Sequence, residues 1–175
     1  MNIHEVIQTV NQMQVDRVIE RYAIGGAVGA TFYIEPVATL DVDIFILLRP
    51  EANQLIASLD PIFEYLKARG STFQGEHVMV AGWPVQFLPP ITPLVDEALE
   101  QAVERDVDGT PARVFTAEHL AAIALQTGRA RDKARLLQFI EAGVIDPGRF
   151  EAVLRRHNLI DRWRQFQQQF STEGP

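Results

Sequence analysis

Cysteine is absent from the 175 residues, which excludes disulfide bonds and thiolate metal sites. No run of about 18 apolar residues occurs, which is the length that a membrane-spanning helix needs. Residues 1–13 do not combine a basic segment with an apolar core, as a signal peptide would. We therefore expect no membrane span and no signal peptide, and we expect the protein to be cytoplasmic.

Histidine is scarce, and two common kinds of enzyme motif are missing. His4, His77, His119 and His157 are scattered without metal-ligand spacing, so we expect them to be surface or packing residues. The sequence contains no phosphate-binding P-loop and no Ser–His–Asp arrangement. These absences exclude P-loop NTPases and serine hydrolases of the familiar types.

Positive charge is scarce before residue 128. Residues 1–127 hold 7 Lys and Arg against 17 Asp and Glu, whereas residues 128–175 hold 9 against 6. A basic C-terminal region facing an acidic metal-binding region suits a metal-bound polyphosphate. The alternative is a solvated helical face, which charge alone favours.

The length and the pattern of the chain predict one α/β (α+β) domain. An apolar fraction of 47% in 175 residues is enough for a full core. Strand and helix patterns are mixed up to residue 115, and helical periodicity continues from Thr116 to the end. We therefore expect a small mixed β-sheet flanked by helices over residues 1–115, with a C-terminal helical subdomain over residues 116–175 packed on it.

Periodicity and capping residues predict the individual elements. Thr92 and Thr116 are expected as helix N-caps, and Gly128 as a helix stop. The expected strands are 22–24, 44–48, a hairpin of two strands over 72–80 and 84–88, and an edge strand at 112–115. The expected helices are 5–20, 27–33, 50–69, 92–103, 116–126, 129–141, 147–157 and 159–170.

Asp41 and Asp43 stand immediately before the apolar strand 44–48, where acidic residues are unfavourable. Residues two apart on a strand point to the same face, so their carboxylates lie side by side. Their repulsion is relieved by a hard divalent cation, Mg²⁺ or Mn²⁺. The alternative is a pair of turn or capping acids at the strand entrance.

Gly25 and Gly26 separate the strand 22–24 from a short helix. Such a turn lets backbone N–H groups and a helix N-terminus face an anion. The alternative, a tight turn that needs positive φ, is equally supported and compatible with phosphate contact.

The order of these features resembles the nucleotidyltransferase superfamily with the DNA polymerase β-like palm. That family has an apolar strand ending in Gly-Gly or Gly-Ser, a short helix, and then T-x-D-h-D, and this chain offers AIGG, AVGATFYI and TLDVD. The later segment LQTGRARDKARLLQFI is similar to the Gly-Arg-x-Lys/Arg-Asp element of toxin-type, AbiEii-like and minimal nucleotidyltransferases. Its matching residues are Gly128, Arg129, Arg131 and Asp132.

The resemblance implies Mg²⁺-dependent transfer of a nucleoside monophosphate from an NTP, with ATP expected, to a protein or RNA hydroxyl. It implies Asp41 and Asp43 as catalytic metal ligands. It implies nucleotide binding by Gly25, Gly26, Thr39, Arg129 and Arg131. A cognate antitoxin-like partner also follows only from the resemblance, and the oligomeric state stays open, with a homodimer among the alternatives.

Two departures from the family pattern weaken the catalytic interpretation. Gln86 occupies the position of the usual third carboxylate, and an amide brings no charge and cannot act as a base. Ala124 stands where toxin-like members carry a Lys. Since single electrostatic contacts are worth roughly 10²- to 10³-fold in turnover, the alternative is a catalytically weak nucleotide- or partner-binding regulatory module.

Three further alternatives involve residues near these motifs. Glu76 either reaches the metal or, as we expect, faces solvent. Trp83 either stacks on a base or, more in keeping with its position, packs against a helix or a partner chain. An acid–base hydrolase that uses the same two acids would work without a metal and has little other support.

Overall fold

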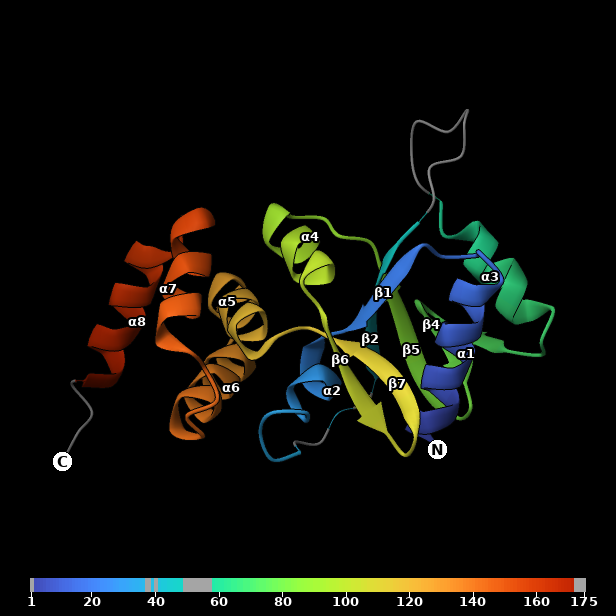
Figure 1. Cartoon of the computed structure of the whole chain (residues 1–175), viewed down its shortest axis with the longest axis horizontal. Helices are drawn as coiled ribbons and strands as arrows, with labels where there is room; N and C mark the ends of the chain where they lie inside the picture. Colours follow the sequence, from blue (N-terminus) through green and yellow to red (C-terminus); the bar gives the residue numbers. More distant parts are fainter. Residues whose placement is uncertain (1, 37–38, 40, 49–57, 172–175) are drawn as a thin grey trace.

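The computed structural model (Figure 1) describes residues 2–36, 39, 41–48 and 58–171. The strands of this part of the chain are β1 (Arg21–Ile24), β2 (Val42–Leu47), β3 (Thr72–Gln74), β4 (His77–Val80), β5 (Trp83–Leu88), β6 (Val103–Val107) and β7 (Thr110–Val114). Its helices are α1 (Ile3–Val15), α2 (Gly26–Ala30), α3 (Asp60–Lys67), α4 (Pro93–Glu100), α5 (Ala117–Thr127), α6 (Ala130–Glu141), α7 (Pro147–Arg156) and α8 (Ile160–Ser171).

The described strands form one mixed sheet in the order β3-β4-β5-β2-β1-β7-β6. β2 lies antiparallel to β1 and parallel to β5, and β1 lies parallel to β7. The predicted mixed α/β fold class is therefore confirmed. The division into subdomains at residue 116 stays a prediction.

The alternation of β2 sends its side chains to two different layers. Val42, Ile44 and Ile46 are fully buried against the layer that contains α1 and α3. Phe45 and Leu47 point to the opposite face and pack against the second core. Because side chains alternate along a strand, Asp43 also lies on this second face.

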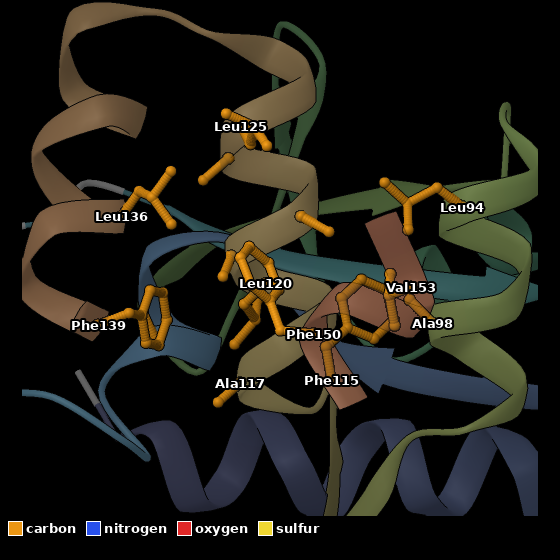
Figure 2. Close-up of a cluster of buried hydrophobic side chains, with 14 of the residues drawn as sticks. Leu94, Ala98, Phe115, Ala117, Leu120, Leu125, Leu136, Phe139, Phe150 and Val153 are labelled. Carbon is orange, nitrogen blue, oxygen red and sulfur yellow. The ribbon is translucent and has the colours of Figure 1, made fainter. Parts of the chain in front are cut away.

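The second core joins the sheet to the C-terminal helices. It contains Ala23 of β1, Leu94 and Ala98 of α4, and a run of small and apolar residues along α5. In Figure 2 the side chains of Phe115, Leu120 and Phe150 lie together in this cluster. In Figure 1, α4 lies between the sheet and the group of α5 to α8.

Capping residues set the ends of several helices as expected. The Thr92 hydroxyl accepts a hydrogen bond from the Val95 N–H at 3.2 Å, and Pro93 is the first residue of α4. The Thr116 hydroxyl accepts one from the His119 N–H at 3.3 Å. Gly128 ends α5 in the left-handed conformation with φ of 69°. These three predictions are confirmed.

Several predicted boundaries were wrong. The helix predicted over 5–20 ends at Val15, because Arg17 takes a positive φ of 62°. The predicted two-stranded hairpin has a third strand, β3, paired with β4. Part of the helix predicted over 50–69 lies outside the described residues, and the described part begins at Asp60.

The edge of the sheet was also predicted wrongly. The strand expected at the edge, β7, lies between β1 and β6. The edge strand β6 was missed because its sequence VERDV has three consecutive charged residues, all of them exposed. Such a strand shows no alternating apolar pattern, as is common for edge strands.

None of the helices in the described part of the chain has both the length and the apolar character needed to cross a lipid bilayer.

Candidate functional site

A cavity of about 830 Å³ lies between the second face of the sheet and the helices α4, α5 and α6. This volume is in the range of small-molecule binding sites. Among its lining residues are those of the predicted site and the two departures from the family pattern: Gly26, Thr39, Asp41, Asp43, Gln86, Ala124, Arg129 and Arg131. Gly25 does not line the cavity.

The two acids reach the cavity from the start of β2. β2 begins at Val42, two residues before the predicted start at Ile44, so Asp43 lies inside the strand and Asp41 precedes it by one residue. Burial raises the pKa of Asp43 above its ordinary value, and the charge of Asp41 raises it further. The side chain of Asp41 is 39% exposed, so desolvation acts mainly on Asp43, which is half-buried.

Asp41 has two polar neighbours. The Thr39 hydroxyl donates to the backbone carbonyl and to Oδ1 of Asp41 at 3.1 and 3.3 Å. His77 Nε2, at the start of β4, lies 3.5 Å from Asp41 Oδ2. Thr39 therefore orients the first acid, and His77, which we expected to be a surface or packing residue, lies beside it.

The glycine pair packs directly against β2. The Gly25 N–H donates to the Asp43 carbonyl at 3.0 Å, and a Cβ on Gly25 would lie 2.4 Å from Phe45 Cε2. Gly26 has φ of 57°, and a Cβ there would lie 1.8 Å from Asp43 Oδ2. The tight-turn interpretation of Gly26 is thus confirmed. Both positions also need glycine for space, Gly25 beside Phe45 and Gly26 beside Asp43.

Gln86 lies beside Asp43 on the sheet. The parallel register of β2 and β5 pairs Asp43 with Gln86, and both residues line the cavity. The Gln86 side-chain amide donates a hydrogen bond to Glu76 Oε2 at 3.4 Å. Glu76 is exposed in the turn between β3 and β4, so the carboxylate that accepts from Gln86 comes from a turn and not from the strand.

The N-terminal half of α6 forms the basic wall of the cavity. Arg129 stands at the N-cap, and Arg131 and Arg135 lie one helical turn apart on the same side. The positive charges of these three arginines lower the pKa of Asp43, but by less than burial and Asp41 raise it. The basic wall and the acid pair therefore interact electrostatically across the cavity.

Sequence reasoning did not assign Arg135 and Asp132 to the site. Asp132 is almost fully buried, with 3% of its side chain exposed. Arg129 donates to it through Nε at 2.6 Å and Nη2 at 3.3 Å. The signal that could have found Arg135 is its spacing of four residues from Arg131, because the two then share a helix face.

Much of the rest of the cavity wall is apolar. It includes Phe45 and Leu88 from the sheet, Val95 from α4, and Leu120 and Ile123 from α5. The cavity thus has a charged half between β2 and α6 and a mainly apolar half between β5, α4 and α5.

The acid pair fits a divalent cation whose coordination is completed by a bound ligand and water. Among the described residues, no group of three or more His, Asp or Glu side chains is arranged to hold a metal ion. Asp41 and Asp43 supply the hard oxygens that Mg²⁺ takes, and Mg²⁺ is usually held by one or two carboxylates together with phosphates and water. A bound cation would also offset the burial of Asp43 and its repulsion by Asp41.

Three other residues weighed in the sequence, Trp83, His119 and His157, lie outside this cavity. Trp83 packs against the core between the sheet and the helices α1 and α3, and its Nε1 is buried without a hydrogen-bond partner in the described structure. His119 and His157 both contact Glu97, at 3.1 and 2.8 Å. Packing is therefore the role that the described contacts give Trp83 and His119.

Comparison with known proteins depends on structure alone. No protein-family model matches the sequence, and no curated protein matches it significantly. The structure is similar to an antigenic nucleotidyltransferase-like protein from Paracoccidioides brasiliensis, with a TM-score of 0.57 and 15% identity over 92% of this chain and 91% of that one. The chain has a nucleotidyltransferase-like fold.

A second similar protein is the antibiotic-resistance factor ANT(2'')-Ia. Its solution structure matches with a TM-score of 0.53 and 12% identity over 97% of each chain. Its crystal structure with adenylyl-2''-tobramycin matches with a TM-score of 0.50 and 11% identity over 97% of this chain and 99% of that one. The nucleotidyltransferase-like fold expected from the AIGG and TLDVD motifs is confirmed, and the AbiEii-like subtype stays a prediction.

Proposed function

We propose that this protein binds an NTP, with ATP expected, together with Mg²⁺ or Mn²⁺, and transfers its nucleoside monophosphate to a protein or RNA hydroxyl. The observation that carries the proposal is the acid pair of β2 facing the arginines of α6 across one cavity. This arrangement is complementary to a cation and a polyphosphate at once. The nucleotidyltransferase-like fold supports the same class of reaction.

Each element of the site has a task in this proposal. Asp41 and Asp43 hold the cation, which when bound neutralises negative charge and polarises a phosphate oxygen. Gly26 leaves space beside Asp43, and Arg129 and Arg131 stabilise the charge of the phosphates. In the transfer, a bond forms between the acceptor oxygen and the α-phosphorus, the bond to pyrophosphate breaks, and the acceptor proton passes to water.

A second candidate is a catalytically weak module that binds a nucleotide or a partner protein. The observation that favours it is the pairing of Gln86 with Asp43, because this is the position beside the acid pair where a third carboxylate would serve. Ala124 in the cavity wall also favours this candidate, because the positive charge of the expected Lys is missing there. An antitoxin-like partner and a homodimer are further proposals that suit either candidate.

Calorimetry tests the shared part of both candidates. We expect ATP to bind in the presence of Mg²⁺ and not in its absence, and Asp41→Asn to abolish the metal-dependent binding. Asp41 is the better target because it is partly exposed and its replacement should not disturb the core. A matched control is Asp60→Asn, at the exposed start of α3 on the other side of the sheet. Equal binding by wild type and Asp41→Asn would reject the site.

Pyrophosphate release then separates the enzyme from the module. If the protein is a weak module, Gln86→Asp should raise pyrophosphate release, by up to about 10²-fold, because it adds a charged oxygen ligand beside Asp43. If the native protein already turns over and Gln86→Asp gains nothing, the enzyme is the better description and Gln86 is not a defect.

A further inference from the structure

Arg135 is an arginine with unused hydrogen-bonding capacity inside the cavity. Its side chain is only 17% exposed, although it lines the cavity. Its Nε is buried and has no hydrogen-bond partner among the described groups. The nearest carboxylate contact joins Nη1 to Asp132 Oδ1 at 3.9 Å, which is too long for a hydrogen bond.

The other two arginines of the basic wall differ from Arg135. Arg129 already donates hydrogen bonds from Nε and Nη2 to Asp132, and its side chain is 56% exposed. Arg131 is exposed as well. Exposed charges are screened by water and salt, whereas a half-buried one acts through a lower dielectric. Arg135 is therefore the member of the wall best placed to bind an anion strongly.

A buried guanidinium with a free donor needs an anionic partner. Burial lowers the pKa of Arg135, whereas the charges of Asp132 and Asp43 raise it. Leaving a buried donor unsatisfied is unfavourable, and the penalty is larger for a charged group. A phosphate oxygen in the cavity would satisfy the Arg135 donors and balance its charge.

Asp132 holds this arrangement from inside the protein. It is buried beneath the wall and contacts Arg129 and Arg135 from one carboxylate. A single negative charge between two guanidinium groups leaves the wall net positive. It fixes Arg129 through two hydrogen bonds and attracts Arg135 electrostatically from 3.9 Å. Asp132 thus acts through the arginines and not on a ligand directly.

We propose that Arg135 is the principal phosphate-binding side chain of this cavity and that Asp132 is the positioning residue that holds it there. This inference rests on the proposed function, which supplies the polyphosphate. It also accounts for Ala124: Arg135 and Ala124 line the same cavity, so α6 supplies the positive charge that α5 does not carry.

The test compares ligands that differ in phosphate number. Calorimetry with Mg²⁺ and adenosine, AMP, ADP, ATP or tripolyphosphate gives a dissociation constant for each. We expect Arg135→Ala to weaken the binding of ATP and of tripolyphosphate by about 10- to 100-fold, as for the loss of a charge-assisted hydrogen bond. The change for adenosine and AMP should be small. Lys133→Ala, which removes a positive charge from the same helix outside the cavity lining, should change none of them.

Two further variants separate position from charge. Arg135→Lys keeps the charge but loses the planar fork, so it should recover only part of the ATP affinity. Asp132→Asn should weaken the binding of ATP and of tripolyphosphate and leave the binding of adenosine unchanged. A general loss of stability would not produce this dependence on the ligand. Thermal unfolding of each variant confirms that the protein is folded.

Failure of the inference is distinct from failure of the proposed function. If Asp41→Asn abolishes ATP binding but Arg129→Ala or Arg131→Ala weakens it as much as Arg135→Ala, the proposed function stands and the inference is wrong. If Arg135→Ala weakens the binding of adenosine and of ATP equally, Arg135 does not bind the phosphates. If the wild-type protein binds no nucleotide with Mg²⁺, the proposed function fails first.

Discussion

At the scale of single residues, Gly26 is the most constrained position of the site. It combines a left-handed backbone with an approach to Asp43 that leaves no room for a methyl group. Either condition alone favours glycine. Together they couple the turn after β1 to the position of the second acid, so the turn and the carboxylate cannot vary independently.

Gly26→Ala should destabilise the protein beyond the cost of its backbone conformation. An alanine in the left-handed region costs about 1–2 kcal/mol, and the contact with Asp43 must add to this. Gly143→Ala is a matched control, because Gly143 has a similar φ of 62° with no atom within 4 Å of the added Cβ. Urea unfolding of both variants measures the difference. Equal losses of unfolding free energy would show that the Asp43 contact is not tight.

The acids and glycines of the site could be predicted because their signals are local. The spacing of Asp41 and Asp43 fixes a common face in any strand, and Gly25 and Gly26 mark a turn in any fold. The pairing of Gln86 with Asp43 needed the family pattern, since register between distant strands is not visible in either strand alone. Arg135 was missed because a basic helix start looks like a solvated face until α5 and the sheet are packed against it.

At the scale of elements, the junction between α5 and α6 positions the basic wall. α5 ends at Gly128, and Arg129 immediately becomes the N-cap of α6. The left-handed glycine therefore sets the direction in which α6 leaves, and with it the direction of the arginines.

Gly128→Ala should lower the free energy of unfolding by about 1 kcal/mol, because the left-handed conformation is unfavourable for alanine. Gly128→Asn should lose less, since Asn is also found at this position of helix ends. The nearest atom to an added Cβ, the Leu125 carbonyl oxygen, is 3.8 Å away, so no clash contributes. Gly148→Ala inside α7 should be neutral or stabilising. Thermal denaturation of the three variants would contradict this account if Gly128→Ala and Gly148→Ala behaved alike.

Elements were predicted best where a cap or an alternating pattern marked them. The start of α4 and both ends of α5 followed from Thr92, Thr116 and Gly128, whereas α4 ends at Glu100, before the predicted residue 103. β6 was missed because an exposed edge strand places no apolar residues at alternate positions. Its pairing with β7 depends on backbone hydrogen bonds, which the side-chain pattern does not reveal.

At the scale of the whole molecule, Glu97 links α4 to the C-terminal helices. Its carboxylate accepts two hydrogen bonds from Arg156, at 2.6 and 3.1 Å. His119 Nε2 and His157 Nε2 lie 3.1 and 2.8 Å from it. The hydrogen bonds from Arg156 are the largest cause that lowers the pKa of Glu97 from 4.5 to about 2. One partly buried charge thus joins three helices.

This link predicts a loss of stability in acid. Because the pKa of Glu97 is lower in the folded protein than its ordinary value of 4.5, its contribution is complete above pH 4.5 and is lost as the pH falls toward 2. His119 acts in the same direction: burial lowers its pKa below 6.5, so its protonation disfavours the folded state as the pH falls below 6.5.

Glu97→Gln should therefore lower the free energy of unfolding at pH 7. It should also make this free energy depend less on pH between pH 4.5 and 2. Urea unfolding at a series of pH values measures this slope. Glu100→Gln, at an exposed position of the same helix, should leave the slope unchanged. A wild-type slope retained in Glu97→Gln would show that other groups control the acid transition.

The order of strands in the sheet also has a consequence for synthesis of the chain on the ribosome. β1 lies between β2 and β7, and its Ile24 pairs with Val114. While the nascent chain extends only as far as β5, one side of the apolar strand β1 has no neighbour. An open apolar edge of this kind promotes aggregation. Translation that stops before Val114 thus yields a fragment that we expect to require a chaperone.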